Sequence, residues 1–526
     1  MLLNIILPFL SGGLYAFGFP RKELPHSILF AHIGVFILFY ILLKKQTNLK
    51  QRLITLLVYC IGHNLVGYYW IPETLKAFGE IPFPINYLLG MIFSLIVLPQ
   101  YFILLFLLAS EKVKQYVTFT PLILTFTLTL LEFFTPQQFP GHLGHTWMQL
   151  APYLSFAKVF GVPIYSFISY LFIFNLIEVT RRKKVSASMV INSAVIFVLL
   201  IINFLNPLKM EVKKTLPIRL VQANIGNLLK IESESGLFNA DQVVFKRYEK
   251  HSLKENDLIM PRLIIWPETA YSKLLNTNRI ESGQNKVPPN LASIALKKNA
   301  YLFTGGYDRA NEGRGGFYQT QYNSALFFSP AAKFIDVYHK RKLIPFGESL
   351  PFGPLNSYLV NLNPNIAFFA EGTTYPIFSI DNEFHFSSAI CYEILFSSFI
   401  RDYLNNASIH PDFIINITND SWYGDTAEPF QHKFLAHWRS IEFQLPLVRM
   451  TNTGISNILY QDGSESKALY HNQEDALDLN LKVSKSLPTL YQRYGILLMI
   501  LFGFLIIGLE RLLKPFLHKI MKPKES

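Results

Sequence analysis

The chain has 526 residues, of which 50% are hydrophobic and only 16% are charged, whereas soluble domains average about 25% charged residues. This composition excludes an ordinary cytosolic enzyme, and the ordered apolar pattern excludes a disordered chain. Two cysteines are too few for a disulfide framework or a cysteine-based zinc site. The formal net charge of +12 comes from Lys and Arg at the ends of apolar runs, which indicates an anionic membrane surface rather than nucleic acid.

Apolar runs long enough to span a bilayer recur through the first 210 residues and return once near the C-terminus, about 20 residues being sufficient for one span. We expect spans near residues 3–20, 27–43, 53–71, 85–109, 118–135, 153–177 and 187–206, and an eighth near 495–513. The first run has no charged leading segment and no clear cleavage site, so we expect a retained helix. The sequence therefore predicts a polytopic membrane domain of seven helices over residues 1–210 and a final helix over 494–514.

Loop charges predict the orientation of these spans. The even-numbered loops, such as 44–52 and 181–184, are much richer in Lys and Arg than the short odd-numbered loops. Because Lys and Arg stay on the cytoplasmic side, we expect both termini inside and the long segment between spans seven and eight outside. Glu132 and His63 fall inside predicted spans. Each is a functional candidate at membrane depth or a helix-to-helix hydrogen-bonding group.

Residues 216–487 have the composition of a soluble α/β domain that can bury a single core. We expect strands over 218–223, 263–266, 301–306, 324–329, 334–338, 385–390, 413–418 and 455–461, and helices over 289–298 and 430–444. This segment has no GxGxxG or GxxxxGK[ST] loop, no HExxH or zinc-type Cys/His spacing, and no GxSxG elbow. We therefore expect no cofactor and no metal.

Three polar residues follow apolar strands in this segment: Glu268 after 263–267, Lys340 after 334–338, and Cys391 after 385–390. Each has an ordinary explanation, since Glu268 could cap a helix, Lys340 could lie on a basic surface, and Cys391 could be an inert buried thiol. An unpaired thiol in an oxidising space nevertheless indicates a reactive role. Together the three are the parts of an acyl-transfer site: a base, a cation and a nucleophile. The backbone N–H of Tyr392 would help to bind the oxyanion.

Five motifs in order, IIWPET, YHKRKLIPFGESLPF, AICYE, NDSWYG and RMTNTG, resemble the nitrilase (carbon–nitrogen hydrolase) superfamily. With the flanking spans, the chain is similar to the apolipoprotein N-acyltransferase family. The resemblance implies an αββα sandwich whose triad is Glu268 as base, Lys340, and Cys391 as nucleophile. It also implies Glu348, Glu393 and Tyr392 as supporting residues and Trp422 and Arg449 as substrate-binding residues. Tyr392, Trp422 and Arg449 could equally be ordinary support for the core or a loop.

The resemblance further implies a two-step transfer. Cys391 would take a fatty acyl chain from a membrane phospholipid, phosphatidylethanolamine being the expected donor, and form a thioester. The amine of a diacylglyceryl-cysteine lipoprotein would then accept the chain, which is the last step of lipoprotein maturation. We expect a monomer in a bacterial inner membrane, with the catalytic domain in the periplasm and no nucleic-acid partner. An apolar segment holding Leu359 and Phe368 could be a lid that enters the outer leaflet, or ordinary core.

Two other functions fit parts of the pattern. A membrane-anchored amidase of the nitrilase type would share the triad but would use water as acceptor. A transporter or receptor with an outer binding domain would need no thiol, and Glu132 or His63 would then matter more. Glu, Lys and Cys together at strand ends favour the transferase, because a binding module has no need for them.

Overall fold

The computed structural model describes residues 3–22, 26–43, 48–79, 81–182, 185–235, 239–255, 259–310, 321–345, 347–349, 355–356, 369–485 and 487–521. Leu359 and Phe368 lie outside these ranges. The chain forms two compact units. Unit 1 comprises Met1–Pro72, Pro82–Lys209 and Thr489–Ser526, and unit 2 comprises Glu73–Ile81 and Met210–Pro488.

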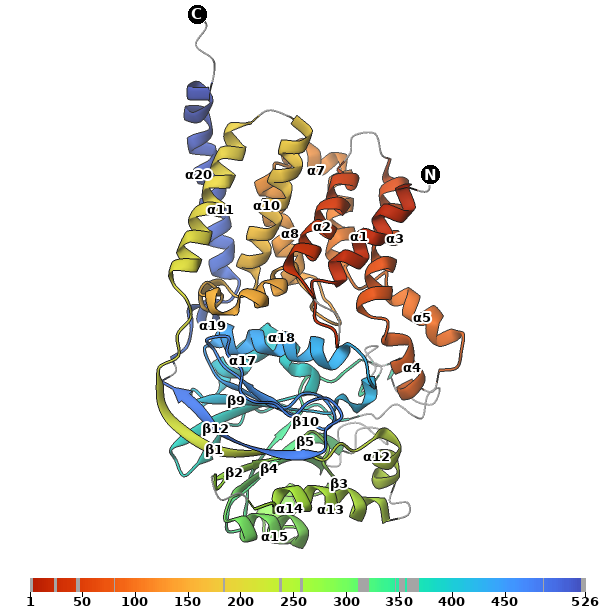
Figure 1. The fold of residues 1–526 in the computed structure, drawn as a ribbon, viewed down its shortest axis with the longest axis vertical. Coiled ribbons are helices and arrows are strands. Elements are labelled where there is room, and N and C mark those ends of the chain that lie inside the picture. The colour runs from red at the N-terminus through yellow and green to blue at the C-terminus, as the bar shows by residue number, and fades with distance from the viewer. Residues whose placement is uncertain are drawn as a thin grey trace, which may run out of the picture. The chain divides into compact units, whose positions relative to one another are not determined.

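Unit 1 is helical (Figure 1). Its helices are α1 (Leu3–Ala16), α2 (Ile28–Leu42), α3 (Leu49–Gly67), α5 (Ile85–Phe93), α6 (Pro99–Ala109), α7 (Glu111–Tyr116), α8 (Pro121–Phe134), η1 (Leu143–Tyr153), α9 (Ala157–Phe160), α10 (Pro163–Arg182), α11 (Ala187–Leu205), α19 (Leu490–Tyr494) and α20 (Leu497–Met521). Helix α4 (Ile71–Gly79) is divided between the two units.

By length and apolar composition, two described helices, α10 and α11, can cross a membrane. A third candidate is α3 with the start of α4, two segments that meet at a bend of 62°. The eight spans expected from the sequence are therefore not confirmed. One reason is visible at 85–109, where the apolar run is two short helices, α5 and α6, because the chain turns over residues 94–98 before Pro99.

Close helix contacts in unit 1 depend on two glycines. A Cβ on Gly12 of α1 would lie 2.0 Å from the carbonyl oxygen of Tyr59, and one on Gly62 of α3 would lie 2.1 Å from that of Phe9. Small residues let α1 and α3 approach backbone to backbone. Glu132 accepts hydrogen bonds from the Tyr170 hydroxyl (2.5 Å) and the Leu143 backbone N–H (3.1 Å). These bonds connect α8, α10 and η1.

Unit 2 contains two β-sheets. The seven-stranded sheet has the order β12-β1-β2-β4-β5-β6, with β3 paired to β4, and the five-stranded sheet has the order β11-β10-β9-β8-β7. The strands are β1 (Val212–Gln222), β2 (Leu263–Ile265), β3 (Tyr271–Leu275), β4 (Tyr301–Arg309), β5 (Gln321–Phe328), β6 (Phe334–His339), β7 (Phe378–Ile380), β8 (Phe384–Ile390), β9 (Phe413–Thr418), β10 (Leu447–Thr451), β11 (Asn457–Leu459) and β12 (Asp475–Ser484). The central pairs β1–β2, β2–β4, β8–β9 and β9–β10 are parallel, so their carboxyl ends meet at a sheet edge.

Aromatic side chains hold the two sheets face to face. The ring of Phe303 on β4 lies 5.2 Å from that of Phe386 on β8, and Phe327 on β5 lies 5.5 Å from Phe378 on β7. Figure 1 shows helices on the outer face of each sheet. These are α12 (Asn227–Glu234), α13 (Ala240–Ser252), α14 (Thr277–Glu281) and α15 (Pro289–Lys298) on one side, and α17 (Ser397–Asn406) and α18 (Glu428–Phe443) on the other. The short helices η6 (Cys391–Leu395) and η7 (Asp420–Tyr423) directly follow β8 and β9. The αββα sandwich implied by the motifs is present.

Candidate active site

Glu268 leaves the sheet at the carboxyl end of β2. Pro267 ends the strand, and its carbonyl accepts a hydrogen bond from the N–H of Gly305 on β4 (3.1 Å). A Cβ on Gly305 would lie 2.5 Å from the Cα of Glu268, so only glycine lets β4 approach this closely. The next residue, Thr269, has a φ of 52°, which turns the chain away from the strand direction. These features fix the point from which the Glu268 side chain emerges.

The Glu268 carboxylate is buried, and each of its oxygens accepts a hydrogen bond. Oε1 accepts from the Asn323 side-chain amide on β5 (2.7 Å), and Oε2 accepts from the Asn419 backbone N–H after β9 (2.9 Å). The Lys340 ammonium lies 3.4 Å from Oε1. Both sheets therefore contribute to the position of this carboxylate.

Lys340 directly follows β6 and its side chain is wholly buried. Its Nζ donates to Glu348 Oε1 at 2.7 Å, and Glu348 Oε2 accepts from the Ile344 backbone N–H at 2.9 Å. Burial opposes the positive charge, but the carboxylates of Glu348 and Glu268 outweigh it and raise the pKa of Lys340 above its usual range. The group is therefore an ammonium at neutral pH and can act as a fixed positive charge.

Cys391 follows β8 and begins η6, with a φ of 52° that turns the chain sharply out of the strand. Its thiol is buried and unpaired. Burial, and next the charge of Glu268, raise the pKa of Cys391 well above its usual range, while Lys340 and a hydrogen bond with Thr418 act in the opposite direction. Glu268 and Lys340 thus contact each other in a buried site, and the charges of both act on the Cys391 thiol, which is neutral at rest.

Glu393 connects the chain after β6 to the end of β8. Its carboxylate accepts hydrogen bonds from the Tyr338 hydroxyl (2.8 Å) and from the backbone N–H groups of Arg341 (2.7 Å), Lys342 (2.9 Å) and Ile390 (2.7 Å). Burial raises the pKa of Glu393 to about 6, although these bonds favour its charged form. Its described hydrogen bonds are with these groups and not with the Lys340 ammonium, so its contact with the triad is indirect.

Tyr392 directly follows Cys391, and Arg449 is connected to the end of β8 through Asn416. The Arg449 guanidinium is fully buried and donates to Asn416 (2.9 Å) and Asp420 (2.8 Å), while the Asn416 amide donates to the Ala389 carbonyl (3.0 Å). Tyr392 is buried, and its ring lies edge-on to that of Phe396 at 4.7 Å. Arg449 thus holds the end of β8 through Asn416, in a position that supports Cys391 from inside the domain.

Trp422 lies half-buried in η7, where the ammonium of Lys230 lies 5.7 Å from its ring centroid. Lys230 is itself buried on α12, donates to the Thr269 hydroxyl, and lies 3.7 Å from Glu234. Sequence reasoning missed both Lys230 and Asn323. A signal for Asn323 existed, because its amide directly precedes the strand expected over 324–329.

Asp420, Glu428 and His432 form a buried cluster whose ligand atoms lie within 4.8 Å of one another. Burial favours the neutral carboxyl, but the Arg449 guanidinium and the hydrogen bonds with His432 and Thr418 together outweigh it and lower the pKa of Asp420 to about 2. The His432 Nε2 lies 3.3 Å from the Cys391 carbonyl oxygen. A metal ion in this cluster would have to compete with a guanidinium that already neutralises Asp420, so we assign the cluster to the support of Cys391.

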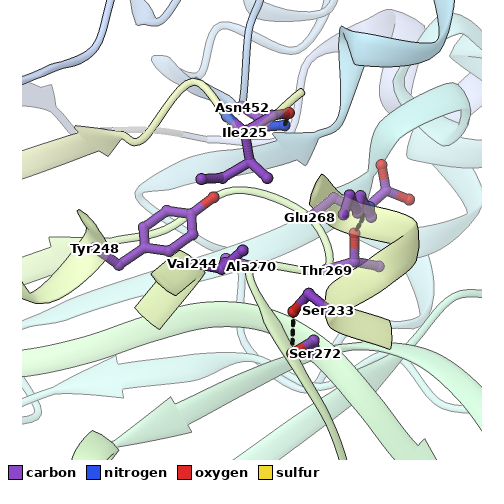
Figure 2. Close-up of a pocket in the computed structure, with 10 residues that line it drawn as sticks. Ile225, Ser233, Val244, Tyr248, Glu268, Thr269, Ala270, Ser272 and Asn452 are labelled. Carbon is purple, nitrogen blue, oxygen red and sulfur yellow. Dashed lines mark hydrogen bonds between the residues drawn. The ribbon is translucent and has the colours of Figure 1, made fainter. Parts of the chain in front are cut away.

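A small cavity of about 10 Å³ lies behind Glu268, lined by residues of α12, α13 and the chain after β2. Figure 2 shows the Glu268 carboxylate directed away from Tyr248 and from the hydrogen-bonded pair Ser233 and Ser272. A cavity of this size holds one water molecule at most. The space beside Glu268 therefore offers no room for substrate.

Comparisons with known proteins agree with this arrangement of units. Residues 11–175 match the family model described as apolipoprotein N-acyltransferase N-terminal domain, and residues 247–477 match that of carbon–nitrogen hydrolase. The apolipoprotein N-acyltransferase of Haemophilus ducreyi is 27% identical, with 85% of each chain covered, and that of Bdellovibrio bacteriovorus is 27% identical, with 82% of this chain and 80% of the relative covered. The chain is thus similar to apolipoprotein N-acyltransferases over most of its length. The resemblance drawn from the five motifs is confirmed.

Solved structures similar to this chain are more distant. An amidase from Nesterenkonia sp. is 16% identical with a TM-score of 0.33, covering 52% of this chain and 92% of the amidase. A carbon–nitrogen hydrolase superfamily protein from Xanthomonas campestris is 16% identical with a TM-score of 0.35, covering 51% of this chain and 91% of that protein.

Proposed function

We propose that this chain transfers a fatty acyl group from a membrane phospholipid, through a thioester on Cys391, to the N-terminal amine of diacylglyceryl-cysteine lipoproteins. Phosphatidylethanolamine is the donor that we expect. The observation that carries the proposal is the buried contact of the Lys340 ammonium with Glu268, beside a thiol whose pKa responds to both groups. A base, a fixed cation and a nucleophile in one site are the requirements of acyl transfer.

In the first step Glu268 takes the thiol proton while the sulfur of Cys391 attacks the ester carbonyl carbon. The negative charge that develops on the carbonyl oxygen is stabilised by the Lys340 ammonium and the Tyr392 backbone N–H. The bond from carbon to the ester oxygen then breaks, and the lysophospholipid leaves with the proton held by Glu268. The thioester remains on Cys391.

In the second step the free amine of the lipoprotein attacks the thioester carbon. Glu268 takes a proton from the attacking nitrogen, the carbon–sulfur bond breaks, and the proton returns to the sulfur of Cys391. The amide product leaves and the neutral thiol is restored. Because both substrates are anchored in a membrane, a site held at its surface raises their effective concentrations.

The other predicted residues receive roles from their contacts. Glu348 holds the Lys340 ammonium, while Glu393 and Arg449 hold the backbone around Lys340 and Cys391. We keep substrate contact as the proposed role of Trp422, since it is half-buried. For Arg449, which we expected to bind substrate, the buried ion pair favours a supporting role.

Further parts of the proposal concern the membrane. We propose that residues 1–210 and 494–514 lie in a bacterial inner membrane with both termini in the cytoplasm, that residues 216–487 lie in the periplasm, and that the protein is a monomer. The apolar helices α10 and α11 support membrane embedding. The segment with Leu359 and Phe368 keeps its proposed role as a lid for the lipid chains.

Intact-mass analysis after incubation with phosphatidylethanolamine tests the reaction. We expect a gain of one fatty acyl group, mapped to Cys391, released by hydroxylamine, and absent from Cys391→Ala. A wild-type protein that gains no acyl group would contradict the transferase. Rapid loss of the acyl group in water without an amine acceptor would favour the amidase, and full function of Cys391→Ala would favour the transporter or receptor.

A further inference from the structure

A cavity of about 560 Å³ lies in unit 2 next to the segments that carry Lys340 and Cys391. Arg341 and Lys342, which line it, directly follow Lys340. Ser398, in the first turn of α17, also lines it and comes shortly after Cys391 in the chain. Part of the cavity wall therefore comes from the segments that carry Lys340 and Cys391, and the rest from Ser349, Asn356, Glu371 and Tyr375. The acyl-transfer chemistry assigns no role to these lining residues.

The two cations of this cavity are held in place. The Arg341 guanidinium lies 3.7 Å from the ring centroid of Tyr375, and the Lys342 ammonium lies 4.2 Å from that of Phe396. The backbone N–H groups of both cations donate to the Glu393 carboxylate, at 2.7 and 2.9 Å. Aromatic faces hold cations without neutralising them. Both positive charges remain available to a ligand.

Lys342 in particular lacks a counter-ion among the described residues. Its side chain is half-buried, and burial lowers its pKa, which Glu393 and Glu371 oppose only through space. A partly desolvated cation gains more from a bound anion than one in water does. The first turn of α17, which no side chain caps, adds the positive end of a helix dipole to the same cavity.

The cavity also carries negative charge, at the exposed carboxylates of Glu371 and Asp402. Two cations and two carboxylates around one space complement a ligand that bears both a negative and a positive charge. A phosphodiester with a primary ammonium a few bonds away has this pattern. A glycerol headgroup has the phosphate but no ammonium, and a free fatty acid has neither group.

We propose that this cavity binds the zwitterionic headgroup of the donor phospholipid, with its phosphate at Arg341 and Lys342 and its ammonium at Glu371 and Asp402. The inference rests on the proposed function, because it takes a phospholipid as the acyl donor. Headgroup binding here would hold the ester bond near Cys391 and would select donors by headgroup. It assigns donor recognition to residues outside the Glu268, Lys340 and Cys391 triad.

Single-turnover acylation of Cys391 by phosphatidylethanolamine in detergent micelles tests the site. The test variant is Lys342→Gln. Its control is Lys467→Gln, which removes the same charge from an exposed position. Loss of a charged hydrogen bond predicts about a tenfold slower acylation for Lys342→Gln. The p-nitrophenyl ester of the same fatty acid, which has no headgroup, should acylate both variants at the wild-type rate. The proposal would be overturned if the phospholipid acylated Lys342→Gln at the wild-type rate. It would also be overturned if the acylation rate of this variant fell equally with the phospholipid and with the p-nitrophenyl ester.

A second comparison tests the ammonium end. Wild-type protein should prefer phosphatidylethanolamine to phosphatidylglycerol, and Glu371→Gln with Asp402→Asn should abolish this preference. Free phosphoethanolamine should compete with the lipid more strongly than inorganic phosphate does. If Lys342→Gln slowed only the transfer to a lipopeptide amine, the cavity would belong to the acceptor and the proposal would be wrong. Failure of the proposed function is distinct, since wild-type Cys391 would then accept an acyl group from neither donor.

Discussion

The ammonium of Lys340 lies 2.7 Å from Glu348 Oε1. Its contact with Glu268 is longer, at 3.4 Å. Glu348 therefore takes the larger share of the ammonium's charge, and Glu268 keeps an oxygen that can accept a proton from the thiol. Asn323 donates to both carboxylates, at 2.7 and 3.1 Å, and so fixes their separation. The division of roles between two carboxylates depends on this asymmetry.

Glu348→Gln should slow acylation of Cys391 by about 10- to 100-fold, because a small misplacement of reacting groups can cost about 100-fold in rate. Without the charge of Glu348, the ammonium of Lys340 would pair with Glu268 and make it a poorer proton acceptor. Single-turnover acylation followed by intact mass measures the effect. Glu281→Gln, an exposed glutamate on α14, is the matched control. If Glu348→Gln were acylated at the wild-type rate, the ion pair of Glu348 with Lys340 would have no part in catalysis.

Alkylation of Cys391 by iodoacetamide should be slow at pH 7 and should rise about tenfold per pH unit beyond pH 9, because only the thiolate reacts. Alkylation is slow at neutral pH because burial and the charge of Glu268 raise the pKa of the Cys391 thiol. Lys340 acts in the opposite direction, so Lys340→Met should make alkylation slower still at every pH. Rates are measured by peptide mass spectrometry. Half-maximal alkylation below pH 8 would contradict this electrostatic description.

Arg449→Met should destabilise unit 2 by about 3–5 kcal/mol, since it leaves the buried carboxylate of Asp420 without its partner. Thermal unfolding of the purified protein in detergent measures the loss. Arg262→Met is the control, because Arg262 is more exposed and pairs with Asp381 at the surface, where an ion pair contributes about 1 kcal/mol or less. Adding Asp420→Asn to Arg449→Met should recover part of the stability. Equal effects of the two arginine variants would contradict a supporting role.

Lys230→Met should reduce the acylation rate about tenfold with little change in lipid affinity. The Lys230 ammonium donates to the Thr269 hydroxyl, directly after the base, and lies over the ring of Trp422. Its loss would let the turn at Thr269 move, and the carboxylate of Glu268 with it. Lys230→Arg keeps the charge and should retain more activity. If both variants bound lipid poorly but acylated normally once saturated, Lys230 would be a substrate contact instead.

Much of unit 2 could be predicted from the sequence. The strand at 263–266 and the helix at 289–298 were predicted within one residue of β2 and α15, because both have strong apolar patterns with Pro at a boundary. Of the three residues at strand ends, Glu268 and Lys340 lie 3.4 Å apart, and the catalytic roles of these two and of Cys391 stay predictions. Short or weakly apolar strands such as β10 and β12 were missed.

Other features depend on tertiary contacts and leave no local pattern. The hydrogen bonds of Glu268 to Asn323 and to the Asn419 backbone come from strands on two different sheets. The division of the apolar run at 85–109 into α5 and α6 depends on packing as much as on length. Hydropathy alone therefore predicted more membrane spans than the described helices support.

Two of the three reactive strand ends carry a left-handed residue that is not glycine, Thr269 at 52° and Cys391 at 52°. Each such residue costs about 1–2 kcal/mol, which the surrounding sandwich must supply. The reacting groups are therefore aligned only while both sheets remain docked. Heating should consequently inactivate the protein before its helices and strands melt, because loosening the sheets releases these two turns first.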